Sequence, residues 1–263
     1  GNVRYDIEKF CFFDKAVLSM LPLIGFKPDI IHCHDWQTGL IPVYLKERFQ
    51  ANEFYWGIKS IMTIHNLKFQ GVWDIKTIKS ITGLPDYYFT PDKMEFKKDA
   101  NYLKGGLVYA DAITTVSKTY AEEIKMPFYG EGLDGLMRAR ANSLRGIVNG
   151  IDYSDYNPET DSHIAKNYSL KNFRKEKVKN KVALQEELGL AVDPKAMMIG
   201  LVSRLTDQKG LDLVAYMMDE LCQDNIQFVV LGTGEAQYEN MFRHFAWTVS
   251  YTHLRAHETS AHL

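Results

Sequence analysis

One strand–turn–helix segment, residues 196–211, constrains the fold of this chain more than any other. Its first part is an apolar run, typical of a buried parallel strand, that ends at Ser203. An amphipathic helix is expected to begin near Gly210, so Arg204 and Lys209 fall in the intervening turn. Such a turn directs backbone N–H groups and the positive end of the helix dipole toward any bound anion. The added guanidinium and ammonium groups favour a diphosphate ligand; the alternative is two solvated charges on a surface loop.

The rest of the chain repeats this alternation of short apolar runs and longer helical periods, which predicts an α/β fold with parallel sheets. The expected strands are residues 29–34, 59–65, 112–117, 145–149, 197–203 and 227–231. The expected helices include residues 4–21, 36–49, 92–109, 118–124, 133–140, 175–188 and 211–221. Gly189 directly follows one of these helices, where a left-handed residue commonly ends a helix.

The domain organisation follows from the polar segment 152–168, which is rich in Asp, Asn and Ser. This segment is the expected linker between two sheets. We expect one domain in residues 1–150 and the start of a second in residues 151–247. A chain of 263 residues is long enough for one large domain or two modest ones.

The composition is that of an ordinary soluble globular protein, with 46% hydrophobic and 24% charged residues. A formal charge of −2 gives no support to nucleic-acid binding, which favours a basic surface. No apolar stretch reaches membrane-spanning length, and the chain starts without a signal-peptide pattern. The three cysteines are far apart, which argues against a disulfide framework and indicates a reducing compartment.

Polar residues and a glycine turn lie at or just beyond the carboxyl end of each expected strand. They are Asp35, His65, Ser117, Asn149, Arg204 and the turn of Gly232, Thr233 and Gly234. In open parallel sheets, ligands bind at this edge. A single polar residue there means little, because turns are polar in general. Together these residues predict a ligand cleft between two sheets.

The run His32, Cys33, His34 suggests a metal site at first sight. Alternation along a strand directs the two histidines to one face and Cys33 to the other, so the three cannot converge on one ion. We therefore expect no metal, with Cys33 packed as a small hydrophobe and His34 and Asp35 at the cleft. The alternative role for Asp35 is to cap the following helix.

Three further features each have two interpretations. His65 could hydrogen-bond a sugar hydroxyl or support a developing charge, although a lone histidine at a strand end is more often structural. Lys104, Gly105 and Gly106 imitate a phosphate-binding loop, but they lie inside a helical period with no strand before it, which favours close helix packing. The turn containing Gly232 and Gly234 either lets a nucleotide approach the backbone or is a plain tight turn.

These segments together resemble starch and glycogen synthases, which are ADP-glucose-dependent, retaining glucosyltransferases with the two-domain GT-B fold. The matching stretches, in the family's order, are PDIIHCHDWQTGL (28–40), TIHNL (63–67), FQG (69–71), YLKGGLVYAD (102–111), TVS (115–117), NGID (149–152), NPETD (157–161) and VSRLTDQKGL (202–211). The last motif is typical of many GT-B transferases, whereas the first two and the NGID segment indicate the synthases.

The resemblance implies a GT-B architecture of two Rossmann-like parallel-sheet domains facing a cleft, both incomplete in this chain. Residues 1–150 would be the later part of the N-terminal, acceptor-side domain. Residues 151–247 would be the linker and the start of the C-terminal, nucleotide-sugar-binding domain.

The resemblance also implies that Arg204 and Lys209 hold the ADP diphosphate and stabilise it as the leaving group. Asp35 and His65 would bind hydroxyls of the transferred glucose, with His65 beside the reacting carbon, and Asn149 would contact the sugar. The absence of an obvious nucleophile fits front-face transfer. No metal or other cofactor is expected, since the two cations neutralise the diphosphate.

Two departures from the family are also expected to matter. The chain starts after the family's Lys-x-Gly-Gly-Leu donor loop and lacks its Glu-x-x-Gly-Leu segment, so we interpret it as an internal fragment. Residues 249–259, VSYTHLRAHET, match the translation of a common sequencing-library transposon adapter. We therefore interpret residues 248–263 as a non-native tail without a pattern that would let it pack, and assign no function to His253 or His257.

The predicted parent protein extends α-1,4-glucan chains (glycogen) from ADP-glucose, and its partners are these substrates rather than nucleic acid or membrane. One alternative is a GT-B glycosyltransferase with a different nucleotide sugar. The other is a non-catalytic glucan-binding protein on the same fold. A bacterial cytoplasm is the simplest location, and a plastid stays open as an alternative. The isolated chain is expected to be inactive and poorly soluble.

Overall fold

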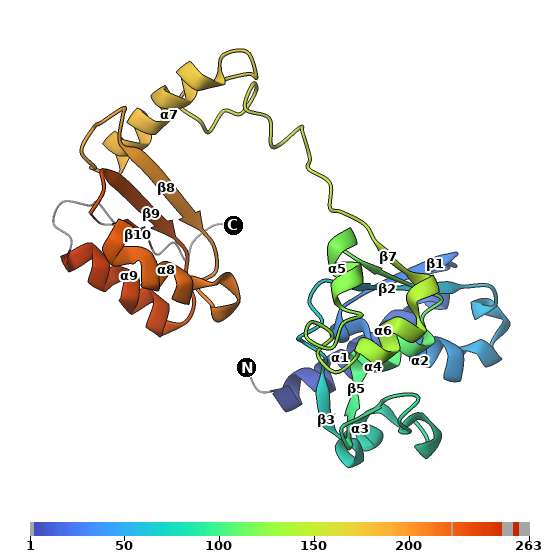
Figure 1. Cartoon of the computed structure of the whole chain (residues 1–263). Helices are drawn as coiled ribbons and strands as arrows, with labels where there is room; N and C mark the ends of the chain where they lie inside the picture. Colours follow the sequence, from blue (N-terminus) through green and yellow to red (C-terminus); the bar gives the residue numbers. More distant parts are fainter. Residues whose placement is uncertain (1–2, 222, 249–254, 258–263) are drawn as a thin grey trace. The chain divides into compact units, whose positions relative to one another are not determined.

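A computed structural model describes residues 3–221, 223–248 and 255–257 (Figure 1). The chain divides into two compact units, which we call unit 1 (Gly1–Gly150) and unit 2 (Ile151–Leu263). Each unit contains a parallel sheet with accompanying helices, which confirms the expected α/β fold class.

Unit 1 contains a four-stranded sheet of order β1-β2-β6-β7 in which every neighbouring pair is parallel. Its strands are β1 (Ile30–His34), β2 (Lys59–Ile64), β6 (Ala112–Thr115) and β7 (Leu144–Gly146). The predicted strand 145–149 is wrong at its carboxyl end. The ladder stops where β6 stops, with Thr115 opposite Gly146, so Asn149 lies beyond β7.

The helices of unit 1 are α1 (Val3–Leu23), α2 (Leu40–Glu47), α3 (Ile75–Thr82), α4 (Tyr102–Tyr109), α5 (Lys118–Glu123) and α6 (Asp134–Ala139). Short 3-10 helices are η1 (Trp36–Thr38), η2 (Phe49–Ala51), η3 (Glu53–Tyr55), η4 (Asp86–Tyr88) and η5 (Ala141–Ser143). Helix α2 contacts both α1 and α4, and the sheet contributes fully buried side chains to the core, among them Cys33, Met62, Ile64 and Ile113.

Glycines let the chain pack closely where α4 meets the start of α2. A Cβ added at Gly106 would lie 2.4 Å from the Met62 side chain, and one at Gly39 would lie 2.3 Å from the Tyr102 carbonyl oxygen. These contacts confirm the packing interpretation of the glycine pair in α4. The neighbouring Lys104 is buried and donates to the carbonyl oxygens of Pro91 and Glu95, so it belongs to the fold.

Two predicted helices of unit 1 are partly wrong. The helix expected at 36–49 is divided into η1 and α2, followed by η2. The helix expected at 92–109 begins only at Tyr102, because β4 (Glu95–Phe96) and β5 (Asp99–Asn101) precede it and pair with β3 (Val72–Asp74) in an antiparallel sheet of order β3-β5-β4. Lys97 and Lys98 both have positive φ, 54° and 74°, which a helix does not allow. The prediction that no strand precedes the segment containing Lys104 is therefore wrong, because β5 comes directly before α4.

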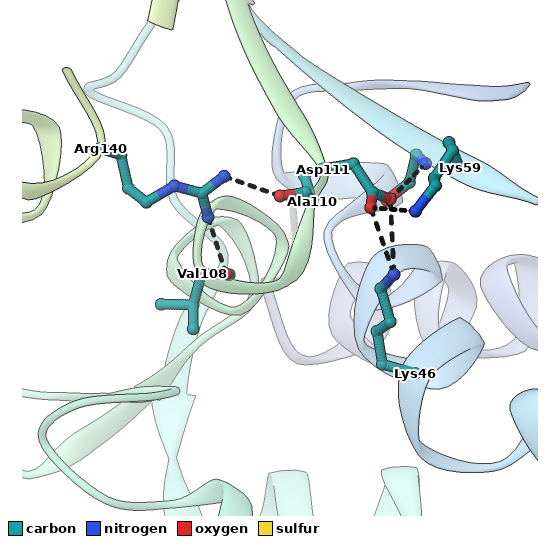
Figure 2. Close-up of polar contacts among 7 residues, drawn as sticks. Lys46, Lys59, Val108, Ala110, Asp111 and Arg140 are labelled. Carbon is teal, nitrogen blue, oxygen red and sulfur yellow. Dashed lines mark hydrogen bonds and ion pairs between the residues drawn. The ribbon is translucent and has the colours of Figure 1, made fainter. Parts of the chain in front are cut away.

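Asp111 joins α2 to the amino ends of β2 and β6 (Figure 2). Its carboxylate accepts a hydrogen bond from the Ser60 backbone N–H at 2.9 Å and pairs with the ammonium groups of Lys46 and Lys59 at 3.4 and 3.3 Å. Burial alone would raise the pKa of Asp111, but the Ser60 bond and the two lysines together hold it below its ordinary value. This cluster lies at the sheet edge opposite to the expected ligand edge.

Unit 2 contains a parallel sheet of order β10-β9-β8. Its elements are α7 (Phe173–Glu187), β8 (Met197–Val202), η6 (Asp207–Lys209), α8 (Leu211–Leu221), β9 (Ile226–Leu231), α9 (Ala236–Thr248) and β10 (Arg255–His257). Gly189 has a φ of 65°, as predicted for the end of α7. Residues 147–172, which include the predicted linker, contain no helix or strand.

Part of the tail does not fit its prediction. We expected residues 248–263 to lack a pattern that would let them pack, yet β10 pairs in parallel with β9, with Arg255 opposite Val229. A backbone ladder needs no apolar period, because the open edge of β9 accepts any extended segment. Residues 249–254, with His253, and 258–263 lie outside the described part of the chain.

Within the described ranges, no helix has both the length and the apolar character needed to cross a membrane.

Candidate functional site

Asp35 links the ends of β1 and β2 at the carboxyl edge of the unit 1 sheet. Its Oδ1 accepts a hydrogen bond from the His65 backbone N–H at 2.8 Å, and its own N–H donates to the Thr63 carbonyl oxygen at 2.9 Å. The alternative role as a helix cap is wrong, because the Asp35 side chain makes no capping bond to η1. Its φ is 55° with a ψ of −172°, a positive-φ conformation that non-glycine residues adopt rarely and often at functional sites.

His65 is hydrogen-bonded to a second histidine from the neighbouring strand. The Nδ1 atom of His34 lies 2.9 Å from Nε2 of His65, so one ring donates and the other accepts. Partial loss of hydration at the ring, followed by the proximity of His32 and His65, lowers the pKa of His34, and Asp35 opposes this shift. The paired histidines are exposed, so both can reach a ligand at this edge.

A row of polar side chains continues from this pair across the same sheet face. The rings of His34 and His32 lie 4.2 Å apart, and His32 Nε2 shares a hydrogen bond of 2.6 Å with Thr63 Oγ1. Thr63 in turn bonds Thr114 at 2.5 Å. Cys33 is buried on the opposite face, as predicted, and burial raises the pKa of its thiol to about 12. In the described part of the chain, no group of three or more metal-binding side chains is placed to hold an ion.

The other two polar residues predicted at strand ends of unit 1, Ser117 and Asn149, are not part of this row of side chains. Ser117 caps α5, and its side chain accepts a hydrogen bond from the Tyr120 backbone N–H. Asn149 is exposed in the segment that follows β7. The structure therefore gives Ser117 a structural role and leaves the sugar contact of Asn149 a prediction.

In unit 2, Arg204 and Lys209 lie in the turn between β8 and α8, as predicted. Both side chains are exposed, while the intervening Leu205 is buried and anchors the turn. The Lys209 N–H donates to the Thr206 carbonyl oxygen at 3.1 Å, and Gly210 has a φ of 65° immediately before α8. This turn carries two exposed cations on a backbone anchored by Leu205, which suits an anionic ligand.

Gly232 and Gly234 lie where the loop after β9 passes the loop after β8. A Cβ added at Gly232 would lie 1.8 Å from the Ser203 carbonyl oxygen, and one at Gly234 would lie 2.1 Å from that of Leu205. The Gly234 N–H also donates to the Glu239 carboxylate at 2.9 Å. These contacts explain both glycines by loop packing, and their role in nucleotide binding stays a prediction.

The candidate residues thus fall into two sets, one in each unit. Asp35 and His65 are in contact in unit 1, which also carries Asn149, whereas Arg204, Lys209, Gly232 and Gly234 belong to the loops after β8 and β9. Sequence reasoning missed the bond between His34 and His65 and the row through Thr63. His32 and His34 alternate along β1, and Thr63 on β2 lies opposite His34, but this pairing can be found only from the register of β1 against β2.

Comparison with known proteins gives consistent similarities. Residues 1–139 match the family model described as the starch synthase catalytic domain. The chain is 74% identical over 252 residues to the glycogen synthase of Lachnospira eligens, covering 94% of this chain and 53% of that protein. It is 67% identical over 246 residues to the glycogen synthase of Lachnoclostridium phytofermentans, covering 94% of this chain and 52% of that protein. The chain thus spans about half the length of these relatives.

Among solved structures, the chain is similar to the catalytic domain of starch synthase IV from Arabidopsis thaliana bound to ADP and acarbose. The TM-score is 0.88 at 30% sequence identity, and the match covers 98% of this chain and 53% of that one.

Proposed function

Because the chain belongs to the starch synthase catalytic domain family, we propose that it forms part of an ADP-glucose-dependent glycogen synthase. The whole enzyme would transfer glucose to the non-reducing end of an α-1,4-glucan with retention of configuration. The observation that carries this proposal is the exposed pair Arg204 and Lys209 on the anchored turn between β8 and α8. The names of the similar proteins support it: two glycogen synthases, and a starch synthase with ADP and acarbose bound.

In the proposed reaction, Arg204 and Lys209 neutralise the diphosphate of the donor as it leaves. The bond between glucose C1 and the phosphate oxygen breaks, and a bond to the acceptor 4-hydroxyl oxygen forms on the same face. The hydroxyl proton passes to the departing phosphate oxygen. Asp35 and His65 would bind the transferred glucose, Asn149 would contact the sugar, and the turn of Gly232 and Gly234 would face the nucleotide. Two preorganised cations can supply the needed charge, so the proposal includes no metal or other cofactor.

Transfer of glucose from ADP-glucose to glycogen by the whole protein tests this role. We expect Arg204→Ala and Lys209→Ala each to lower kcat by about a hundredfold or more, because each removes a charge that stabilises the leaving group. Lys177→Ala, which removes an exposed ammonium group on α7, is the matched control and should leave kcat unchanged.

Two results would contradict the proposal. Faster transfer from another nucleotide sugar than from ADP-glucose would favour a different GT-B enzyme. Glucan binding without any transfer, and without an effect of Arg204→Ala or Lys209→Ala, would favour a non-catalytic glucan-binding protein.

A further inference from the structure

His34 is the last residue of β1 and has no role in the proposed reaction, although its ring contacts a residue that does. The Nδ1 atom of His34 lies 2.9 Å from Nε2 of His65, and the two ring centroids lie 5.2 Å apart. In the register of β1 against β2, His34 lies opposite Thr63, and His65 follows Thr63 by two residues. Side chains two residues apart along a strand share a face, so the two rings meet on one face of the sheet.

The backbone of His34 is held by the short helix that follows it. The Thr38 hydroxyl group accepts a hydrogen bond from the His34 N–H at 2.7 Å and donates one to the His34 carbonyl oxygen at 2.9 Å. The His34 ring also lies against the ring of His32, which is itself bonded to Thr63. His34 therefore presents its Nδ1 atom from a fixed backbone and a supported ring.

The backbone of His65 is fixed separately from its ring. Its N–H donates to Asp35 at 2.8 Å, which holds the main chain but does not constrain rotation of the imidazole. Within the described residues, the hydrogen bond that the structure gives the His65 ring is the one to His34. This bond therefore selects the orientation of the His65 ring.

The bond also decides which nitrogen of His65 is left for a ligand. A neutral imidazole carries one proton, so one of its ring nitrogens donates and the other accepts. Either His34 donates from Nδ1 to Nε2 of His65, or His65 donates in the opposite direction. In both arrangements Nε2 is used within the pair, and Nδ1 of His65 is the free nitrogen. A sugar hydroxyl both donates and accepts, so it can bond to that nitrogen in either arrangement.

The groups around the pair favour an uncharged His34. Partial loss of hydration, followed by the proximity of His32 and His65, lowers the pKa of His34, and Asp35 opposes this shift. One added proton can be shared within the bond between the rings, whereas two added protons would place two N–H groups face to face. The pair should therefore persist near neutral pH.

We propose that His34 is a positioning residue for glucose transfer: it engages Nε2 of His65 and thereby directs Nδ1 of His65 at the transferred glucose. This inference rests on the proposed function, which assigns a sugar contact to His65. A ring held in this way does not have to be oriented during the reaction, so its hydrogen bond is available when charge develops at the reacting carbon. His34 itself contacts neither substrate.

Two substitutions of the same shape separate the hydrogen bond from the space that His34 fills. Asn places an amide atom at the distance of Nδ1 from the backbone, whereas Leu has the same branching without a polar atom. We expect His34→Leu to lower kcat of the whole protein about tenfold, and His34→Asn to stay within about twofold of the wild type. His163→Leu is the matched control. The exposed His163 bonds Asp161, outside the candidate residues, so its loss should leave kcat unchanged.

A double-mutant cycle shows whether His34 acts through His65. In a His65→Ala background, we expect His34→Leu to lower kcat no further, because the ring that it positions is gone. A purely structural role would give the same loss of kcat in both backgrounds and would overturn the inference. A His34→Asn variant as slow as His34→Leu would also overturn it.

A wild type without transferase activity would refute the proposed function rather than the contact between the rings. The ring ¹⁵N resonances of histidine then test the contact itself, with His65 assigned by comparison with His65→Ala. The inference predicts that His34→Leu shifts the ring resonances of His65 more than His34→Asn does. Unchanged resonances of His65 in His34→Leu would overturn it.

Discussion

At the scale of single residues, Asp35, His34 and His65 hold one another at the ends of two adjacent strands. Asp35 keeps a positive φ with an extended ψ, a conformation that costs about 1–3 kcal/mol in a non-glycine residue. Its bond to the His65 N–H and the ring-to-ring bond of His34 then fix the backbone and the side chain of His65. The site residue proposed to meet the sugar is thus preorganised by two neighbours.

The lowered pKa of His34 predicts a dependence of stability on pH. Its neutral form is favoured in the folded protein, so below the ordinary pKa of 6.5 the unfolded chain binds the extra proton more readily. The unfolding free energy should therefore fall as pH decreases from about 7.5 to about 5.5. His34→Asn removes this titration, so the variant should lose less stability than the wild type.

Urea unfolding of the wild type and His34→Asn at both pH values measures this difference. His32, Asp35 and His65 surround His34 and are present in both proteins, so their direct contributions cancel to first order. An equal loss of stability in the two proteins would contradict the assignment of this pH dependence to His34.

At the scale of elements, the carboxyl end of α4 is closed by a side chain that is distant in sequence. The Arg140 guanidinium donates to the carbonyl oxygens of Leu107, Val108 and Ala110 at 2.8, 2.8 and 2.7 Å, and Figure 2 shows two of these bonds. The last carbonyl groups of a helix have no partner within it, and a cation there also suits the helix dipole. Arg140 therefore fastens the segment after α6 to α4.

We expect Arg140→Ala to lower the unfolding free energy by about 1–3 kcal/mol, because it leaves charge-assisted bonds unmade in a partly buried place. Arg138→Ala is the matched control. Its exposed side chain pairs with Asp134 and the Lys125 carbonyl oxygen, so its loss should cost about 0.5 kcal/mol. Urea denaturation of both variants measures the two losses in unfolding free energy. Equal losses would contradict the capping role of Arg140.

The sequence predicts the main elements well and the small ones poorly. Six of the seven strands described in the two parallel sheets, all but β10, and helix α8 follow from apolar periodicity, which burial enforces. The antiparallel sheet of β3, β4 and β5 was missed because its strands have two or three residues and its turn carries two lysines rather than Asn-Gly. Helix α3 was missed as well, inside the region between the recognised motifs.

The candidate site was predicted in part for a related reason. We predicted Asp35, His65, Arg204 and Lys209 because each follows a strand, and the topology of a parallel sheet places such residues at one edge. The bond between His34 and His65 depends on the register of β1 against β2, which no local pattern indicates. Contacts of this kind can be identified only from the structure.

At the scale of the whole molecule, both sheets leave apolar side chains uncovered. Ile30 in β1 is 53% exposed, and Met197 and Val202 in β8 are 62% and 77% exposed. Apolar strand residues with this exposure normally pack against further elements, and the relatives are about twice as long as this chain.

We therefore expect the 263-residue chain alone to aggregate and to lack transferase activity. Size-exclusion chromatography and a glycogen elongation assay of the purified chain measure both properties. A monodisperse chain that elongates glycogen would contradict this expectation.

The most direct test of the account is the incorporation of labelled glucose into glycogen by the whole protein, with ADP-glucose and UDP-glucose supplied in parallel. The account predicts a higher kcat/KM with ADP-glucose, and α-1,4-linked product of retained configuration. Incorporation that is faster from UDP-glucose, or absent from both donors, would contradict it.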